Sequence, residues 1–263
     1  MLLKDKTAVV YGAGGAVGAA VARTFAREGA HVFLTGRDRG ELDALAKEIA
    51  AADGKAEVAE VDALDAESVE SHLDTVVAKT GTVDVSFNAI GIPQTGVQGI
   101  AITELSLESY LLPITTYTRS HFITASAAAR KMVPARSGVI LLHTAEPGKA
   151  GVSLLGGMGP AWAAIESFTR ELSVECAEYG VRAVCLRTSG MVETPLIDEV
   201  FGIHAEVYGT SSEQFADAIA QRTHRKRPTA LTELAEVTAF VASDRAAAMT
   251  GTVANLTGGL VSD

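Results

Sequence analysis

The chain has 263 residues, a length that suits one α/β domain with a substantial core. Hydrophobic residues make up 48% and aromatic residues only 5%, so the core is expected to be aliphatic. The net charge of −10 disfavours nucleic acid and anionic membrane surfaces as partners, because both are bound by clustered Lys and Arg. The two cysteines match no metal-binding or redox spacing, and no metal site is expected.

Short β-branched runs alternate with Ala-rich amphipathic stretches along nearly the whole chain. Strands are expected at residues 7–11, 31–35, 56–61, 83–88, 138–144, 181–187 and 252–256. Helices are expected near residues 16–28, 39–52, 66–79, 107–132, 161–179 and 232–243. This alternation predicts right-handed βαβ crossovers and a doubly wound parallel sheet of about seven strands, covered by helices on both faces. The fold class is α/β, in one Rossmann-type domain over residues 1–263.

The start of the chain and its apolar runs bear on cellular location, and residues 192–227 bear on access to a site. The chain enters its first predicted strand within a few residues of Met1, so we expect no secretory signal. No apolar run reaches the ~20 residues that cross a bilayer, and we expect a cytoplasmic protein. Residues 192–227 form the longest departure from the alternation, which makes them a candidate lid over a site.

A glycine-rich turn follows the first predicted strand and opens the first predicted helix. Glycine lets backbone N–H groups approach a pyrophosphate, which then lies at the positive end of the helix. A purely structural turn is the alternative interpretation. The residues expected to approach a dinucleotide here are Gly12, Gly14, Gly15, Ala16, Val17 and Gly18.

The end of the second predicted strand bears on which dinucleotide binds. A carboxylate at this place would bind the ribose 2′-hydroxyl of NAD, but the chain has Gly36 followed by Arg37. The Arg37 guanidinium can meet a 2′-phosphate with paired, charge-assisted hydrogen bonds. NADP is therefore the predicted cofactor, with NAD as the alternative. In a second interpretation, Arg37 is solvated and pairs with Asp38.

These motifs resemble those of the short-chain dehydrogenase/reductase family, from about residue 5 to residue 260. The turn at 12–18 is similar to that family's G-x-x-x-G-x-G, with Ala16 in place of the middle glycine, and the Leu256-Thr257-Gly258-Gly259 run resembles its final strand and turn. The resemblance implies an NAD(P)-dependent oxidoreductase that acts on a small molecule. It also implies a homodimer or homotetramer in which the helices near 107–132 and 161–179 pack against a second subunit.

The resemblance implies further cofactor contacts along the carboxyl edge of the sheet. Gly15 stands where many NADP-preferring members have a second basic residue, so half of that signature is present. Trp162 stands where the family has the Lys that holds the nicotinamide ribose. The other implied cofactor residues are Asp62, Ala63, Asn88, Gly91, Ser189, Gly190, Val192 and Thr194.

The same register predicts that the usual catalytic tetrad is missing. The family's Ser, Tyr, Lys and Asn fall on Ala145, Met158, Trp162 and Tyr117, respectively. The related enoyl reductases place their Tyr at the position of Leu155, so their pair is lost as well. A positioned general acid or base contributes ~10²–10⁴-fold in rate. Met158 and Trp162, four residues apart on one helix face, instead predict a drier, apolar cleft.

Three polar residues remain as candidates for catalysis. Tyr117 carries a phenol, Thr144 precedes the lost Ser, and Glu146 could act as a base or bind a cationic substrate. For each residue the alternative is a structural role: Thr144 as an ordinary strand residue and Glu146 as a solvated carboxylate. His143, at the end of the same strand, has the alternative of a hydrogen-bonded histidine facing a helix.

Three functions remain open at this point. The first is a divergent reductase of an iminium ion or an activated alkene, since hydride transfer to such groups needs orientation more than a proton relay. The second is a nucleotide-binding homologue without catalysis, acting as a regulatory or assembly subunit. The third is a non-redox lyase or isomerase with Glu146 as its base.

Overall fold

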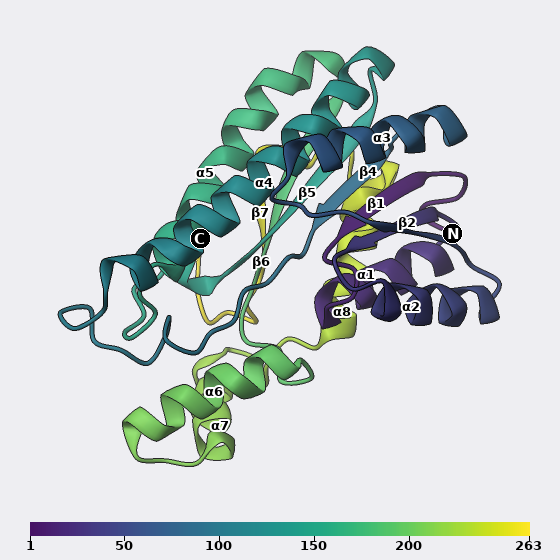
Figure 1. Cartoon of the computed structure of the whole chain (residues 1–263). Helices are drawn as coiled ribbons and strands as arrows, with labels where there is room; N and C mark the ends of the chain where they lie inside the picture. The colour runs from purple at the N-terminus through teal and green to yellow at the C-terminus, as the bar shows by residue number, and fades with distance from the viewer.

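The computed structural model describes residues 1–263, which build a seven-stranded parallel sheet with helices on both faces (Figure 1). The strand order is β3-β2-β1-β4-β5-β6-β7. The strands are β1 (Thr7–Tyr11), β2 (His31–Gly36), β3 (Lys55–Glu60), β4 (Val85–Asn88), β5 (Gly138–Ala145), β6 (Val181–Thr188) and β7 (Thr252–Leu256). The order reverses between β1 and β4, and sheets of this type bind ligands beyond the carboxyl ends of the strands at such a point. The predicted doubly wound sheet is confirmed.

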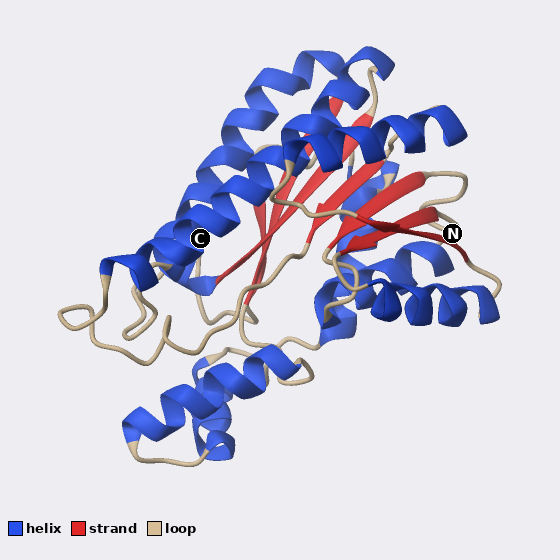
Figure 2. Cartoon of the chain, viewed as in Figure 1, coloured by secondary structure: helices blue, strands red, loops and turns tan.

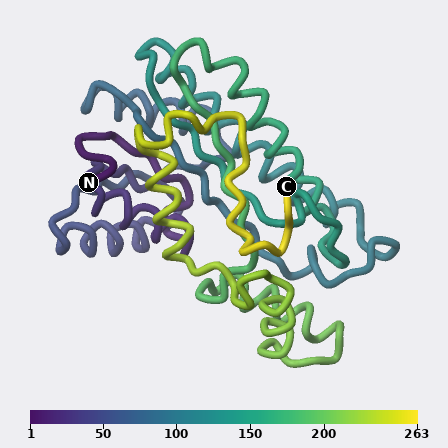
Figure 3. Tube along the Cα trace, turned by 180° about the vertical axis from the view of Figure 1, so that it is seen from behind, coloured from purple at the N-terminus to yellow at the C-terminus, as the bar shows by residue number.

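Two helical layers cover the sheet (Figure 2). One layer contains α1 (Ala16–Arg27), α2 (Arg39–Ala51) and α8 (Leu231–Ala242), and α8 packs against α1 although it lies near the other end of the chain (Figure 3). The other layer contains α3 (Ala66–Thr80), α4 (Leu107–Ala135) and α5 (Met158–Cys176), packed in that order. None of the helices is both long and apolar enough to span a membrane.

The sheet is buried equally on its two sides, by two hydrophobic clusters of 27 buried residues each. In β5, Val139 and Leu141 belong to the cluster beneath α1 and α8, whereas Ile140 and Leu142 belong to the cluster beneath α4 and α5. This is why the strand reads as an uninterrupted apolar run rather than an alternating one.

Side-chain caps fix where several helices begin. Asp38 accepts hydrogen bonds from the backbone N–H groups of Gly40 and Glu41 at the start of α2, and Asp65 does the same for α3. α5 begins at Met158, three residues earlier than expected, after Gly157. Met158 and Trp162 therefore occupy the first turns of this helix and lie one turn apart.

The largest departure from the expected elements is the segment at 192–227, which contains two further helices. These are α6 (Pro195–Tyr208) and α7 (Ser212–Arg222), which pack together below the carboxyl edge of the sheet (Figure 1). Local signals for both were present in the sequence. Thr194 caps α6 ahead of Pro195, and Ser211 forms a capping box with Gln214 at the start of α7.

Candidate active site

The turn after β1 is shaped by contacts that only glycine permits. Gly12 has φ +72°, and a Cβ there would lie 2.8 Å from the carbonyl oxygen of Ala89. A Cβ at Gly18 would collide with the carbonyl of Gly12, so the first turn of α1 packs directly on the preceding loop. Gly15 is the N-cap of α1 and provides no side chain to its free N–H groups. Such an open helix start is a site for an anionic group such as a pyrophosphate.

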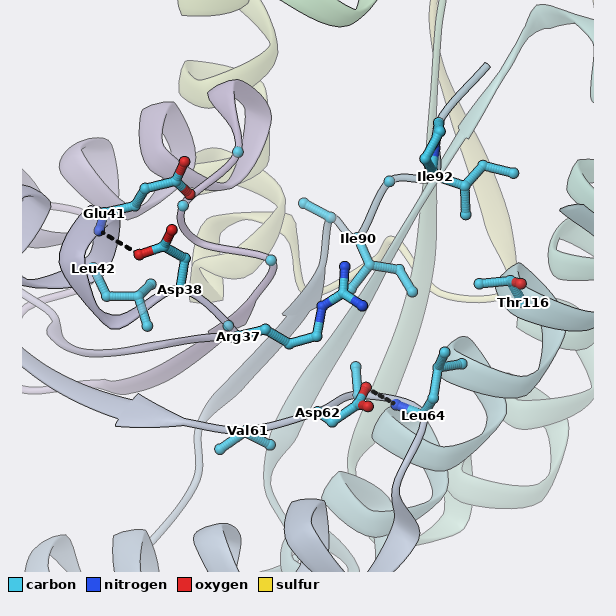
Figure 4. A pocket seen from close by; sticks show the side chains of 18 of the residues that line it. Arg37, Asp38, Glu41, Leu42, Val61, Asp62, Leu64, Ile90, Ile92 and Thr116 are labelled. Atoms are coloured by element: carbon cyan, nitrogen blue, oxygen red, sulfur yellow. Dashed lines mark hydrogen bonds between the residues drawn. The ribbon is translucent and has the colours of Figure 1, made fainter. Parts of the chain in front are cut away.

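A cavity of about 430 Å³ opens beside this turn, at the carboxyl ends of β1 to β4 (Figure 4). Its lining includes the predicted residues Gly12, Gly14, Gly15, Arg37, Asp62, Ala63 and Gly91. It does not include the predicted residues Ala16, Val17, Gly18, Asn88, Trp162, Ser189, Gly190, Val192 and Thr194. Apolar walls that the sequence analysis did not single out come from Leu42, Val61, Leu64, Ile90, Ile92, Pro93 and Leu112. The cavity thus combines a glycine cradle with flat apolar walls, as a dinucleotide requires.

Arg37 extends into this cavity toward Asp62 and Ile90 (Figure 4). Asp38 does not hold it there, because the Asp38 carboxylate accepts from Gly40 N–H at 2.8 Å and caps α2. The alternative in which Arg37 pairs with Asp38 is therefore not what the structure shows.

Glu41 also lines the cavity, with Asp38 and Asp62, and the sequence analysis did not single it out. A Cβ at Gly14 would collide with the Glu41 carboxylate, so this carboxylate lies over the glycine turn. Glu41 belongs to the first turn of α2. No local sequence signal places it there, because the approach to Gly14 depends on how α2 and the turn after β1 meet at the sheet edge.

Asp62 and Asn88 shape the loops at the edge of the cavity. The Asp62 carboxylate accepts from Leu64 N–H at 2.9 Å. The buried Asn88 side chain donates to Thr124 Oγ1 at 3.0 Å and accepts from Ile90 N–H at 3.1 Å. Asn88 therefore joins the end of β4 to α4 and acts on the cavity through the backbone of its own loop.

Farther along the sheet edge, Tyr117 and Trp162 face each other between α4 and α5. Their ring centroids are 6.2 Å apart, Tyr117 is almost fully buried, and Met158 is also buried. Burial raises the pKa of Tyr117 to about 12. The phenol stays protonated at neutral pH and can donate a hydrogen bond.

Thr144 is fully buried and bonded away from the cleft. Its hydroxyl donates to Glu166 Oε1 at 3.2 Å and lies 3.2 Å from Cys185 Sγ. Glu166 is itself held by Arg187 through Nε at 2.7 Å and a second nitrogen at 2.8 Å, and Arg187 also binds the Asp263 carboxylate at 2.6 Å. The structure thus joins Thr144 to a buried ion network rather than to Tyr117 or Glu146.

The sequence analysis missed this network, although one signal was present. Glu166 follows Trp162 by four residues, so a charged residue occupies a position on the inward face of α5. A carboxylate at such a position needs a buried cation, which Arg187 of β6 supplies.

Glu146 begins a short 3₁₀ turn (Glu146–Gly148) directly after β5 and is half-buried. Burial raises the pKa of its carboxyl group to about 7, against a weaker lowering effect of Arg222 in α7. The turn packs on α5, because a Cβ at Gly148 would lie 3.1 Å from Trp162 Cβ. The carboxyl group of Glu146 can therefore exchange a proton near neutral pH, at the start of a turn that packs on α5.

Two polar groups near the ends of β5 and β6 also lie in this region. His143 Nε2 lies 3.0 Å from Thr188 Oγ1, and burial, with a smaller contribution from His121, lowers the pKa of His143 to about 4. The imidazole is therefore neutral at physiological pH. Ser189 Oγ is buried without a hydrogen-bond partner, so it remains available for a ligand.

The remaining predicted residues lie where β6 leads into α6. The Thr194 hydroxyl donates to the Met191 carbonyl at 3.0 Å and accepts from Ile197 N–H at 3.4 Å, capping α6. A Cβ at Gly190 would lie 2.9 Å from the Phe201 ring. These positions join the sheet edge to the α6–α7 pair, and Val192 is exposed beside them.

Comparison with known proteins extends over the whole fold. The family described as enoyl-(acyl carrier protein) reductase matches residues 12–261. The L-rhamnose 1-dehydrogenase (NAD(P)(+)) of Azotobacter vinelandii is 31% identical over 99% of this chain and 98% of its own length. An uncharacterized oxidoreductase of Bacillus subtilis is 29% identical over 98% of this chain and 92% of its own length.

Solved structures give the same result. A variant of actinorhodin polyketide ketoreductase, crystallised with NADPH, superimposes with a TM-score of 0.88 at 28% identity, over 97% of each chain. Sorbitol-6-phosphate 2-dehydrogenase from Erwinia amylovora superimposes with a TM-score of 0.90 at 27% identity, over 97% of this chain and 100% of that one. The glycine turn, the strand order and these matches together show that the chain belongs to the short-chain dehydrogenase/reductase family of oxidoreductases.

Proposed function

We propose that this protein is an NADP-preferring oxidoreductase with an atypical, apolar substrate pocket, NAD being the alternative cofactor. The observation that carries the proposal is the cavity beside the Gly12–Gly18 turn, with Arg37 extending into it. Two comparisons support it, because one solved relative holds NADPH and another relative is named for both NAD and NADP. We call this cavity, lined by Gly12, Arg37 and Asp62, together with the adjoining turn up to Gly18, the adenosine half of the cleft.

Different residues would bind different parts of the cofactor. The glycine turn and the free N–H groups at the start of α1 would bind the pyrophosphate. Arg37 would bind the 2′-phosphate, and Ser189 Oγ is free to hydrogen-bond the nicotinamide end. Glu41 lies over the turn and must rotate away from an incoming phosphate, because the two negative charges repel each other.

We call Tyr117, Glu146, Met158 and Trp162 the substrate half of the cleft. Bound NADPH supplies a hydride, and the chain must orient its acceptor. Half-buried Trp162 offers apolar surface where the family has Lys, and Met158 is buried on the same face of α5. A dry site strengthens the attraction between Glu146 and a cationic group. An iminium ion fits this arrangement, because a hydride added to its carbon gives a neutral amine without any proton transfer.

An activated alkene is the second acceptor that these residues suit. Hydride addition to the β-carbon leaves an enolate, which needs one proton at the α-carbon to give the saturated product. Glu146 has a pKa of about 7 and Tyr117 is protonated at neutral pH, so either group can supply that proton. The pH dependence separates the two donors, because only Glu146 loses its proton between pH 6 and pH 8.

The test measures oxidation of NADPH over a panel of cyclic imines, enones and simple carbonyl compounds. We expect turnover with an imine or enone that falls at least tenfold in Glu146→Gln or Tyr117→Phe, the scale of one lost polar group in the transition state. Arg119→Ala, at another position of α4, serves as the matched control. NADPH binding without turnover of any panel member would contradict the proposed reaction but not the cofactor.

A second function is favoured by the placement of Thr144. Its hydroxyl is committed to Glu166, and Ala145 and Met158 carry no exchangeable proton. A nucleotide-binding subunit without catalysis, with a regulatory or assembly role, would have such a site. This function predicts tight NADPH binding and no turnover. It also predicts that Glu146→Gln leaves the regulatory or assembly role unchanged. A lyase or isomerase with Glu146 as its base would instead turn over its substrate without oxidising NADPH.

The protein is also proposed to form a homodimer or homotetramer through α4 and α5. Phe122 is 59% exposed and Val174 is 80% exposed, while the Phe122 ring packs against the tilted ring of Phe168, with ring centroids 5.8 Å apart. Burial of this apolar stripe against a second copy of the chain would stabilise the oligomer. Phe122→Glu should shift the mass measured by analytical ultracentrifugation toward the monomer, whereas Glu175→Ala beside it should not.

A further inference from the structure

The cavity of the adenosine half has an excess of negative charge. Its lining contains one basic side chain and three acidic ones, namely Arg37 and then Asp38, Glu41 and Asp62. The N-cap of α1 is Gly15, so the helix start that would bind the pyrophosphate adds no second cationic side chain. The affinity for a dinucleotide that carries an additional phosphate therefore depends on how each of these charges is compensated.

Two of the three carboxylates are bonded to the backbone of their own loops. Asp38 Oδ1 accepts from Gly40 N–H at 2.8 Å and from Glu41 N–H at 3.2 Å. Asp62 Oδ1 accepts from Leu64 N–H at 2.9 Å in the loop after β3. These N–H groups hold both carboxylates in place and compensate part of their charge.

The Glu41 carboxylate has no such compensation. It is exposed, and its side chain takes part in none of the hydrogen bonds or ion pairs of the structure. Arg39, two residues earlier, pairs with Asp43 at 3.6 Å. The Arg37 side chain points toward Asp62 instead (Figure 4). Glu41 therefore brings an unpaired negative charge to the cavity.

The position of this charge is fixed by packing of the Glu41 side chain on the glycine turn. A Cβ at Gly14 would lie 3.3 Å from Glu41 Cβ and would collide with Glu41 Oε2. Asp38 caps the first turn of α2 and holds the backbone of Glu41 beside the turn. Rotation about the bond to the carboxylate exchanges its two oxygens but leaves the charge where it is, at the cavity wall.

The ribose of the adenosine moiety is the part of a dinucleotide that would pass this charge. It joins the pyrophosphate, which would lie at the glycine turn, to the adenine, which would lie against the apolar wall of Val61 and Leu64. A 2′-phosphate on this ribose adds about two negative charges, which the Glu41 carboxylate repels. A 2′-hydroxyl is neutral and can donate a hydrogen bond to a carboxylate.

From this arrangement we infer that Glu41 is a specificity-determining residue that opposes Arg37. Arg37 attracts a 2′-phosphate and Glu41 repels it, so the preference for NADPH is weaker than Arg37 alone would produce. NADH thereby remains a usable cofactor. The inference rests on the proposed function in placing the dinucleotide in the adenosine half, but it does not depend on which reaction follows.

Binding measurements test the inference without substrate or turnover. Glu41→Gln removes the charge and keeps an oxygen acceptor of nearly the same shape. We expect the Kd for NADPH to fall about fivefold, while the Kd for NADH stays within about twofold of the wild-type value in calorimetric titrations. Because salt screens repulsion between exposed charges, the gain for NADPH should shrink when the ionic strength is raised to about 1 M.

Two fragments locate the effect at the adenosine end. Adenosine 2′,5′-bisphosphate and 5′-AMP differ only by the 2′-phosphate, and neither contains a nicotinamide. Glu41→Gln should tighten binding of the bisphosphate about fivefold and leave binding of 5′-AMP within about twofold of the wild-type value.

The matched control is Glu48→Gln, which makes the same change of net charge on the same helix. Glu48 lies outside the cavity and pairs with Arg23 at 2.8 Å, so this variant should keep the wild-type ratio of the Kd values for NADPH and NADH. A ratio that stays unchanged in Glu41→Gln, moves toward NADH, or changes equally in Glu48→Gln would overturn the inference while the proposed cofactor stands. If wild-type protein binds neither dinucleotide, the proposed cofactor fails and the inference fails with it.

Discussion

The adenosine half and the substrate half of the cleft lie along one edge of the sheet, but different parts of the chain build them. Backbone geometry shapes the adenosine half: Gly12 and Gly18 permit approaches that any side chain would block, and the cavity there is open. Packed side chains from distant elements shape the substrate half, where Tyr117 of α4 meets Trp162 of α5.

The two halves also differ in what supports them. Behind the adenosine half lies an aliphatic core of Ala, Val and Leu under α1 and α2. Behind the substrate half lies the ion network of Glu166, Arg187 and Asp263, to which Thr144 is bonded. Substitutions elsewhere in the chain can leave the glycine turn unchanged, because neighbouring residues shape it. The substrate half is built from side chains of several elements, so a substitution in any of these elements alters it. The contrast predicts different responses to mutation.

The largest expected effect is on the support of the substrate half. Arg187→Met leaves the Glu166 carboxylate buried without its cation, which should lower the free energy of unfolding by about 3–5 kcal/mol. Chemical denaturation measures the loss. The control is Arg23→Ala, which removes an exposed pair with Glu48 and should cost at most about 1 kcal/mol. Equal losses of unfolding free energy in Arg187→Met and Arg23→Ala would show that the buried ion network does not stabilise the substrate half more than an exposed ion pair would.

The next effect is on the adenosine half. A methyl group at Gly18 collides with the Gly12 carbonyl, so Gly18→Ala should shift the turn and weaken NADPH binding about hundredfold, or about 2.8 kcal/mol. Calorimetric titration gives the Kd. Gly151→Ala, where an added Cβ meets nothing within 4 Å, should leave the Kd unchanged. Unaltered binding in Gly18→Ala would show that the cavity is not where the dinucleotide binds.

A smaller effect concerns the carboxyl group of Glu146. Its pKa in the folded protein is about 7, above the ordinary value of 4.5, so the unfolded chain gives up this proton at lower pH. The associated stability is complete below about pH 4.5 and is lost as the pH rises through 7, a change of about 1–3 kcal/mol.

Glu146→Gln should therefore lose less stability than the wild type between pH 5 and pH 8. Thermal unfolding followed across that range by circular dichroism tests this expectation. Glu60→Gln, at an exposed position of β3, should follow the wild-type profile. Parallel profiles for wild type and Glu146→Gln would place the Glu146 carboxyl group in water.

The smallest effect tests cofactor preference within the adenosine half. Arg37→Ala should weaken NADPH binding about tenfold, or about 1.4 kcal/mol, and leave NADH binding within twofold. Arg39→Ala, which removes an exposed pair with Asp43, is the control. A similar loss of affinity for NADPH and NADH would show that Arg37 does not recognise the 2′-phosphate.

Much of the fold could be predicted from the sequence. The seven strands follow from short β-branched runs, and six helices follow from apolar spacing, because both patterns are local. The α6 and α7 helices were missed, although Thr194 and Ser211 cap them. They contribute little to the core, because only Phe201, His204 and Ala205 of α6 are buried and no residue of α7 is. α6 is bonded to the β4–α4 loop, about 100 residues earlier in the chain, and α7 packs on α6.

The candidate site was predictable to a smaller extent. The cavity lining at Gly12, Gly14, Arg37 and Asp62 could be named, since residues that follow parallel strands meet at one sheet edge. The direction in which the Thr144 side chain points could not be predicted, because a side chain at the end of a strand can point toward either the cleft or the core. Thr144 turns inward to Glu166, a partner 22 residues later.

By itself, the sequence determined the seven strands, six of the helices, the glycine turn and the placement of Met158 and Trp162 one turn apart near the start of α5. These features are local, so neighbouring residues suffice to specify them. Only the tertiary structure decided that Thr144 is bonded to a buried ion network, that burial raises the pKa of Glu146 to about 7, and that Tyr117 of α4 meets Trp162 of α5. Burial and pairing depend on what distant elements place beside a residue, and no local pattern contains that information.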